Sequence, residues 1–223
     1  PIYVGNYVGE EATGKYVIDN TETALLSADS IQVGQQAFGE FGPQGQSEPI
    51  YIKDVVMNSV NDINFNTTGT VYLVDEDEAN GALKVGNGTG YPSVSIGASN
   101  VNTFGCADRS AIILVSPPPP EPQNPPQPTP IATISISSTS DLSVDNIRTE
   151  GGEVSMSASG LITTHGVDSN GYGISFTSDD ITIDGQINAG TSADPFEPAT
   201  ISFYTHETNE WQQTVNKPIY VGN

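Results

Sequence analysis

The last two fifths of the chain alternate apolar and polar residues in rows that recur every 20 residues. The rows are ISISSTSDLSVDNI from Ile134, VSMSASGLITTHGV from Val154 and ISFTSDDITIDGQI from Ile174, and a fourth begins 27 residues later, at Ile201. Alternation with a period of two predicts strands with one buried face. Repetition of the row predicts one supersecondary unit stacked on the next, which is an all-β, parallel β-helix (β-solenoid) of roughly 20–25-residue coils.

Residues 1–115 have the same character but a less regular spacing. Their strand-like segments are KYVID (15–19), SIQVG (30–34), PIYIKDVVM (49–57), DINFN (62–66), TVYLVD (70–75), ALKVG (82–86), SVSIG (93–97) and AIILV (111–115). Gly, Asn and Asp clusters between them predict turns. The one segment that favours a short helical turn is TETALLSADS (21–30).

A proline-rich segment, SPPPPEPQNPPQPTP (116–130), separates the two parts. Proline fixes φ and lacks the backbone N–H, so neither a helix nor a central strand can form there. The sequence therefore predicts three parts. They are a β-rich solenoid part (1–115), an exposed proline-rich loop or linker (116–130), and β-solenoid coils (131–223).

The net charge of the chain disfavours several classes of binding partner. The chain has 27 acidic and 6 basic residues and a net charge of −21. Binding to nucleic acid depends on Lys and Arg, so it is not expected, and anionic membrane surfaces are disfavoured for the same reason. Membrane insertion is not expected either, because the longest apolar run, 111–115, is far below the ~20 residues that a spanning helix needs. Cys106 is the only cysteine and excludes an intrachain disulfide. A buried apolar side chain and a cross-link between chains remain its two interpretations.

The densest acidic run is VDEDEANGALKV (74–85). Asp75, Asp77, Glu78 and Asn80 before Gly81 distantly resemble a calcium loop, since oxygen ligands suit this hard cation. The alternative is a solvated hairpin turn. No cofactor is required by the sequence, and Ca²⁺ is the one candidate ion.

Candidate catalytic residues are few. Asp179, Asp180 and Asp184 lie close together in SDDITID (178–184), and paired carboxylates hydrolyse glycosidic bonds. The alternative is that the first two lie in a turn and Asp184 begins the next one. The chain lacks a G-x-S-x-G nucleophile elbow. We therefore expect a protein that is not an enzyme, with a carbohydrate-binding or carbohydrate-active β-helix as one alternative.

The stretch EGGEVSMSASGLITTHGVDSNGYGISFTSDDITIDGQINA (150–189) resembles the repeats of filamentous-haemagglutinin-type exoproteins. Those repeats combine Gly-Gly, an apolar-x-apolar-x-Ala/Ser strand, a Gly, Asp or Asn turn and a second strand. The resemblance is good over 131–190. Residues 1–115 share only the general pattern of short strands and turns. It implies a right-handed parallel β-helix, secretion and an adhesive or filamentous role at the cell surface, and it brings no catalytic residues.

The hexapeptide PIYVGN occurs twice, as Pro1, Ile2, Tyr3, Val4, Gly5, Asn6 and as Pro218, Ile219, Tyr220, Val221, Gly222, Asn223. The two copies are 217 residues apart, so the second copy predicts the start of a second period. About nine coils at a rise of ~4.8 Å each give an expected period of roughly 40–45 Å.

The expected function is a structural repeat unit of an extracellular or cell-surface fibre, which polymerises end to end through β-strand stacking. Its expected partner is the protein itself, as head-to-tail repeats or subunits, with surface glycans as a further candidate. An alternative is a non-covalent filament whose subunits exchange the hexapeptide strand.

Overall fold

The structure is a computed structural model. It describes residues 1–7, 13–14, 16–34, 48–58, 60–76, 81–106, 110–117, 131–190, 199–204 and 220–221. The fold is nearly all β, and every strand pair in it is parallel. The sequence prediction of an all-β fold with parallel strands is therefore confirmed.

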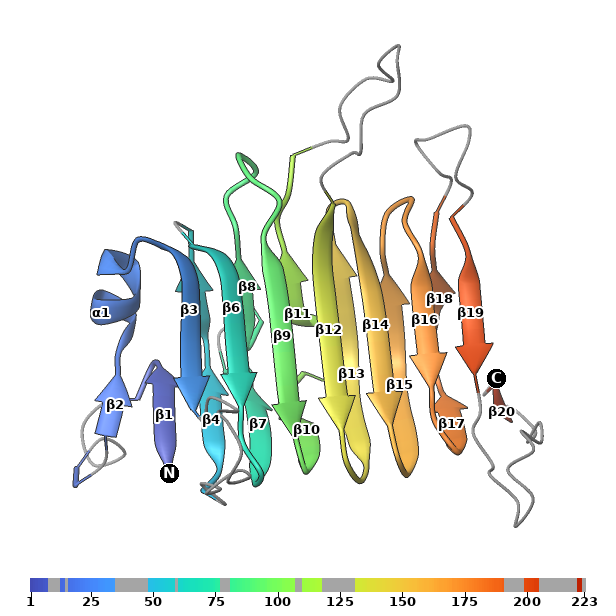
Figure 1. The fold of residues 1–223 in the computed structure, drawn as a ribbon, viewed down its shortest axis with the longest axis horizontal. Helices are drawn as coiled ribbons and strands as arrows, with labels where there is room; N and C mark the ends of the chain where they lie inside the picture. Colours follow the sequence, from blue (N-terminus) through green and yellow to red (C-terminus); the bar gives the residue numbers. More distant parts are fainter. Residues whose placement is uncertain are drawn as a thin grey trace, which may run out of the picture.

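The strands lie side by side along the long axis of the molecule, in one sheet of 13 strands and one of seven (Figure 1). Neighbours in the seven-stranded sheet come from successive passages of the chain. Its strands are β3 (Ala28–Gly34), β6 (Val60–Asn66), β9 (Ser93–Ala98), β12 (Ala132–Ser138), β14 (Gly152–Ala158), β16 (Ile174–Thr177) and β19 (Ile201–Tyr204).

The 13-stranded sheet has two arms. Its first arm consists of β2 (Tyr16–Ile18), β1 (Ile2–Gly5), β4 (Ile50–Lys53), β7 (Thr70–Val74), β10 (Asn100–Phe104), β13 (Leu142–Thr149), β15 (Leu161–Asp168), β17 (Asp180–Ile183) and β20 (Tyr220–Val221). Its second arm consists of β5 (Val55–Met57), β8 (Leu83–Val85), β11 (Ser110–Leu114), the second halves of β13 and β15, and β18 (Ile187–Asn188). The long strands β13 and β15 belong to both arms and join them.

The 20-residue rows of the sequence are stacked in register. Ile134 lies beside Val154, and Val154 beside Ile174. Ile174 then lies beside Ile201, so the longer fourth row is confirmed as well. The same inward positions, two residues further on, form a second column.

Other rows are longer than the predicted 20–25 residues. Ile2 pairs with Ile50, 48 residues later, and Val101 pairs with Leu142, 41 residues later. The extra residues lie in the connections between paired strands, and a connection can vary in length because it does not change the sheet pairing on either side. One of them holds the proline-rich segment, of which 118–130 lies outside the described residues. Strands from before and after it are hydrogen-bonded neighbours, since β9 pairs with β12 and β11 with β13.

The core lies between the two sheets. Its largest side chains are almost fully excluded from solvent and stand one above the other in columns. Burying each of them contributes about 1.5–3 kcal/mol. The column in the middle of the seven-stranded sheet consists of Val33, Phe65, Ile96, Ile136, Met156, Phe176 and Phe203.

Buried Ser and Thr hydroxyls form hydrogen bonds to backbone carbonyls at the corners where the chain turns from one strand to the next. Thr149 Oγ1 lies 3.0 Å from the carbonyl oxygen of Gly152 and 3.1 Å from that of Ser169. Ser138 Oγ lies 2.6 Å from the carbonyl oxygen of Ser99, one row away. A corner interrupts the backbone ladder, so these side chains satisfy carbonyl groups that the turn would leave without a donor.

In the described parts of the chain the one helix is α1 (Asn20–Leu25). Asp19 caps it by accepting a hydrogen bond from the Glu22 backbone N–H at 2.9 Å, and the Glu22 side chain returns to the Asp19 N–H. The helix predicted within 21–30 is thus confirmed for its first turn, whereas residues from Ala28 onward belong to β3. No described helix has the length and hydropathy of a membrane span.

Candidate assembly surfaces at the two ends of the strand stack

The second copy of the hexapeptide lies at one end of the stack (Figure 1). Its strand β20 pairs with β17, and the partners are Thr182 with Tyr220 and Ile183 with Val221. This pairing is parallel, like that of every row before it. Pro218, Ile219, Gly222 and Asn223 lie outside the described residues. The described part of the hexapeptide therefore continues the first arm by one further strand.

The first copy of the hexapeptide lies near the opposite end. On one edge β1 pairs with β4, where Tyr3 lies beside Tyr51 and Val4 beside Ile52. On its other edge β1 pairs with β2, where Tyr3 lies beside Val17. Asn6 lies outside the strand and donates its backbone N–H to the carbonyl of Lys53 at 2.8 Å. The two copies of one sequence thus occupy equivalent places in one arm, one near its beginning and one at its end.

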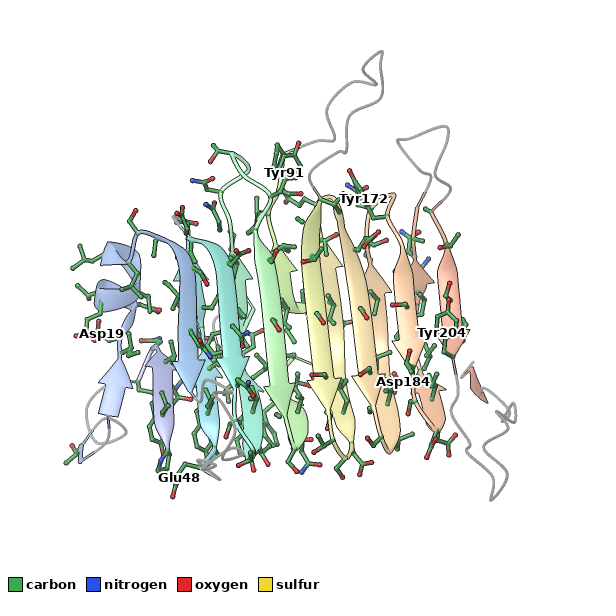
Figure 2. All side chains as sticks on the ribbon, viewed as in Figure 1. Asp19, Glu48, Tyr91, Tyr172, Asp184 and Tyr204 are labelled. Atoms are coloured by element: carbon green, nitrogen blue, oxygen red, sulfur yellow. The ribbon has the colours of Figure 1, made fainter. Side chains whose placement is uncertain are left out.

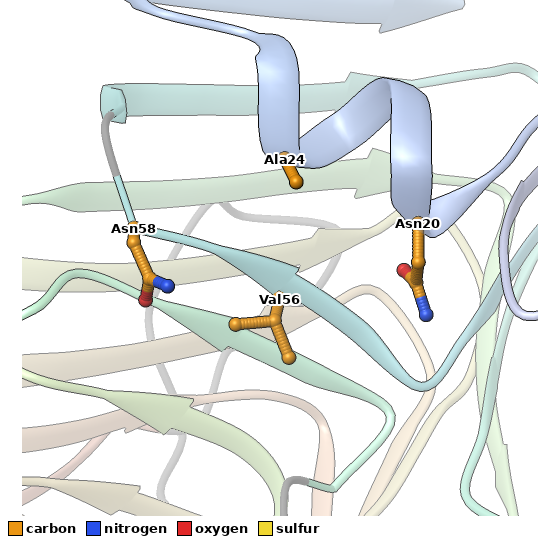
Figure 3. A pocket seen from close by; sticks show the side chains of 4 residues that line it. All are labelled: Asn20, Ala24, Val56 and Asn58. Atoms are coloured by element: carbon orange, nitrogen blue, oxygen red, sulfur yellow. The ribbon is translucent and has the colours of Figure 1, made fainter.

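Helix α1 follows β2 and packs over β5, the outermost strand of the second arm. Asn20 donates its side-chain N–H to the carbonyl of Asp54 at 2.9 Å. An open pocket of about 210 Å³ lies between the helix and β5. It is lined by Asn20, Ala24, Val56 and Asn58 (Figure 3). The helix therefore covers this end of the stack without filling the space beneath it.

Within the described residues, β3 and β19 are the two edge strands of the seven-stranded sheet. Register places Ile31 of β3 and Ile201 of β19 at the two ends of one column. Val33 and Phe203 end the second column in the same way. Ile201 is 40% exposed, and Phe203 is partly buried with its ring stacked on Phe176 at 5.2 Å between centroids. The edge strand β19 thus carries exposed Ile201 and partly buried Phe203 at the positions where β3 carries Ile31, which is partly buried, and Val33, which is buried.

Stacked tyrosine rings follow the first copy of the hexapeptide. Tyr3 and Tyr51 are 4.8 Å apart between ring centroids and nearly parallel, and Tyr51 and Tyr72 are again 4.8 Å apart. We call these three residues the Tyr ladder. The three rings contact one another face to face, and Tyr7 and Phe104 lie 5.1 Å and 5.7 Å from the two outer rings, Tyr3 and Tyr72. This arrangement suits axial stacking more than it suits the binding of a sugar on a flat ring face.

Burial, and after it the neighbouring hydroxyls of Tyr3 and Tyr72, raises the pKa of Tyr51. In the unfolded chain Tyr51 ionises near pH 10. Above that pH the unfolded chain has lost this proton while the folded chain retains it, so folding stability is expected to fall as pH rises further. We expect Tyr51→Phe to lose less thermal stability than the wild type between pH 8 and pH 11, measured by circular dichroism. Equal losses would contradict this assignment.

The predicted calcium ligands fall in two groups. Asp75 is buried at the end of β7, and its backbone N–H donates to the carbonyl of Phe104 at 3.0 Å. Asp77, Glu78 and Asn80 lie outside the described residues. Among the residues that the structure does describe, no group of three His, Cys, Asp or Glu side chains could hold a metal ion. The calcium site therefore stays a prediction.

Sequence reasoning missed a charged corner beside Asp75. Lys53 is buried, and its Nζ lies 2.9 Å from Glu76 Oε2 and 5.3 Å from the centre of the Tyr7 ring. Asp54 adopts a φ of 50° and accepts a hydrogen bond from the Glu76 backbone N–H at 2.9 Å. The lysine thus has a carboxylate partner at the end of the next row. The signal in the sequence was one lysine and one aspartate between two apolar runs.

The aspartates proposed for carbohydrate chemistry lie on the outside of β17 and its turns. Asp180 begins the strand and is exposed. Asp184 follows the strand, and its Oδ1 lies 2.9 Å from His165 Nδ1 with both side chains exposed. The carbohydrate alternative stays a prediction. Cys106 is buried, as the apolar interpretation predicted, and its Sγ lies 3.5 Å from the carbonyl oxygen of Phe104.

Comparison with known proteins finds no match among family models, curated proteins or solved structures.

Proposed function

We propose that this chain is one period of a β-solenoid fibre at the cell surface or in the extracellular space. In this proposal the two sheets wind as one solenoid, and 218–223 is the first row of the following period. The observation that carries the proposal is the pairing of β20 with β17, which gives the second hexapeptide the same kind of place that the first one has.

The two ends fit this proposal along the seven-stranded sheet as well. If β19 of one period pairs with β3 of the next, the column register places Ile201 on Ile31 and Phe203 on Val33. It also places Tyr204, which is 55% exposed, over Gly34, which has no side chain of its own. Both sheets then continue across the junction with apolar residues on apolar residues, and this covers the edges that an isolated stack leaves open.

Charge supports a fibre that does not clump sideways. Each period carries a net charge close to the −21 of the chain, and like charges repel neighbouring fibres in solution. Axial cohesion comes from the backbone ladders, the core columns and the Tyr ladder. Register assigns Tyr220 to the place of Tyr3, so each junction is followed by the three stacked tyrosine positions.

The structure changes the expected dimensions of the fibre. From β1 to β17 the first arm has seven rows in one period, namely β1, β4, β7, β10, β13, β15 and β17. Each is hydrogen-bonded to the next, so no further row fits between them. The expected nine coils are therefore too many, and seven rows of ~4.8 Å give an axial period of about 34 Å.

The test combines mass and diffraction. In the natural protein we expect meridional fibre diffraction near 4.8 Å and an axial repeat of about 34 Å. A repeat far from this value, or a particle without axial order, would exclude the fibre. Mass under fully denaturing conditions then separates tandem repeats within one long chain from a non-covalent filament. The non-covalent filament would dissociate into monomers. In that filament the hexapeptide strand of one subunit would pair with the neighbouring subunit.

A further inference from the structure

Strand β2 has the sequence pattern of β17. Tyr3 and Val4 of β1 pair with Val17 and Ile18 of β2. Tyr220 and Val221, the same two positions of the hexapeptide, pair with Thr182 and Ile183 of β17.

Aligned through their common partner, Val17-Ile18-Asp19 corresponds to Thr182-Ile183-Asp184. Valine and threonine have nearly the same shape, and the Ile-Asp that follows is identical. The two aspartates lie near opposite ends of the molecule (Figure 2).

The two strands also use the same edge of the hexapeptide. One edge of β1 is occupied by β4 and the other by β2. In a following period the strand equivalent to β4 must lie on the edge of β20 that β17 leaves open. Consequently β17 and β2 require one and the same edge, and a single hexapeptide strand cannot pair with both.

After the shared aspartate the two segments diverge. Asp184 faces His165 and leads through a turn to the short strand β18. Asp19 caps helix α1, which lies over β5 above the open pocket. The structure that follows β2 therefore covers an end, whereas the structure that follows β17 continues a row.

We propose that β2 pairs with β1 in the way that β17 of a preceding copy would pair with it. It occupies the edge of β1 where no preceding period is stacked, and gives up this edge to β17 of the preceding copy at each junction. This inference rests on the proposed function. An unpaired strand edge is a template for uncontrolled association. With β2 in place, the first arm ends at a three-residue strand followed by a helix instead of at the full edge of β1, and growth along this arm requires a strand with the β17 pattern.

The test is a chain of two copies that share one hexapeptide, so that Tyr220 of the first copy is also Tyr3 of the second. In a Cys106→Ala background, cysteines replace Thr182 and Tyr220 of the first copy and Val17 of the second. Neighbouring strands place aligned Cα atoms within disulfide range. The shared cysteine can bond to either of the other two, and peptide mapping by mass spectrometry measures both products.

We expect the disulfide from the shared cysteine to position 182 to exceed the disulfide to position 17 by about tenfold or more. Both competing cysteines belong to one chain, so their effective concentrations are similar, and β17 has further paired rows behind it whereas β2 has none among the described strands. A comparable mixture would overturn the inference, because β2 would then keep the edge. A large excess of the Val17→Cys product would overturn the proposed function itself, because the junction would not form.

The single chain supplies a separate check. With Tyr3→Cys and Val17→Cys in the Cys106→Ala background, we expect nearly complete disulfide formation within one chain. Failure to form it in a folded chain would overturn the inference and leave the fibre proposal untouched, since β2 would then not cover β1.

A second variant does not depend on disulfide geometry. Successive N–H groups of a strand point to opposite edges, so Val17→Pro with Ile18→Pro removes whichever donor faces β1. We expect this variant to associate as its concentration rises, by light scattering after size exclusion. The matched Val17→Thr with Ile18→Val variant is expected to behave as the wild type. If the proline variant associates no more than this control, β2 does not protect the edge.

Discussion

Replacing Phe176 with alanine is expected to lower the free energy of unfolding by about 3–5 kcal/mol. Phe176 is fully buried, and its ring stacks on Phe203 with centroids 5.2 Å apart and planes 8° apart. On its other side it follows Met156 in the same column. Neighbouring rows are held at the strand spacing by backbone hydrogen bonds, so they cannot close the cavity that the missing ring leaves. Urea denaturation followed by circular dichroism measures the change.

Phe203→Ala is the matched control for this prediction. It removes the same ring from the last row, where the side chain is only partly buried. Solvent already reaches this position, so we expect a loss of about 1–2 kcal/mol, well below that of a buried ring. If both substitutions cost the same, the column would not distinguish an interior row from an end row, and our description of the core would be wrong.

Gly5→Ala is expected to detach the first strand from the stack. Gly5 has a φ of 108°, a conformation that residues with a Cβ rarely adopt. A Cβ there would overlap the carbonyl oxygen of Lys53 and approach Val55 Cγ2 to 2.6 Å. Strain of this kind costs about 1–3 kcal/mol, and the overlap adds to it. We expect amides of β1 and β2 to exchange hydrogen much faster, whereas amides of β12 and β14 keep their protection.

Gly14→Ala separates the effect of backbone strain from the effect of the overlap with the Lys53 carbonyl. Gly14 also has a positive φ, 73°, but among the described residues no heavy atom lies within 4 Å of a Cβ placed there. This variant carries the backbone strain alone, at about 1–2 kcal/mol, and β1 should stay protected. Equal exchange of β1 in both variants would show that φ, and not the close approach to Lys53, fixes this strand.

The regular half of the fold could be predicted from the sequence because its signal is local. Ile134, Val154 and Ile174 are equally spaced, and a one-residue slip would turn every apolar side chain outward. The register observed between these rows is the one that the spacing predicted. Uniform rows with little between them leave no other way to pair the strands.

The irregular half was predicted as strands but not as rows. Most of its strand-like segments are strands, yet β10 was not recognised, because NVNTF has little alternation. Long excursions such as the one between β1 and β4 remove the fixed spacing, so the partner of each strand could not be found from the sequence. Only the pairing in space shows that seven rows lie from β1 to β17.

The candidate assembly surface divides in the same way. Identity of the two hexapeptides is visible in the sequence and predicted that the ends of the unit are related. The role of β2 is not visible there, because the resemblance between Val17-Ile18-Asp19 and Thr182-Ile183-Asp184 is too short to notice alone. It becomes meaningful once both segments are seen to pair with the same two residues.

By itself, the sequence determined that the chain is built of parallel strands with one buried face, since periodic burial acts on each segment separately. It also determined that the two hexapeptides form equivalent strands. The tertiary structure decided which strands are neighbours, how many rows lie between the two hexapeptides, and which segment covers the free edge of the first one. Those features depend on contacts between residues far apart in the chain. No local sequence pattern determines whether β2 or β17 pairs with a given edge of the hexapeptide strand.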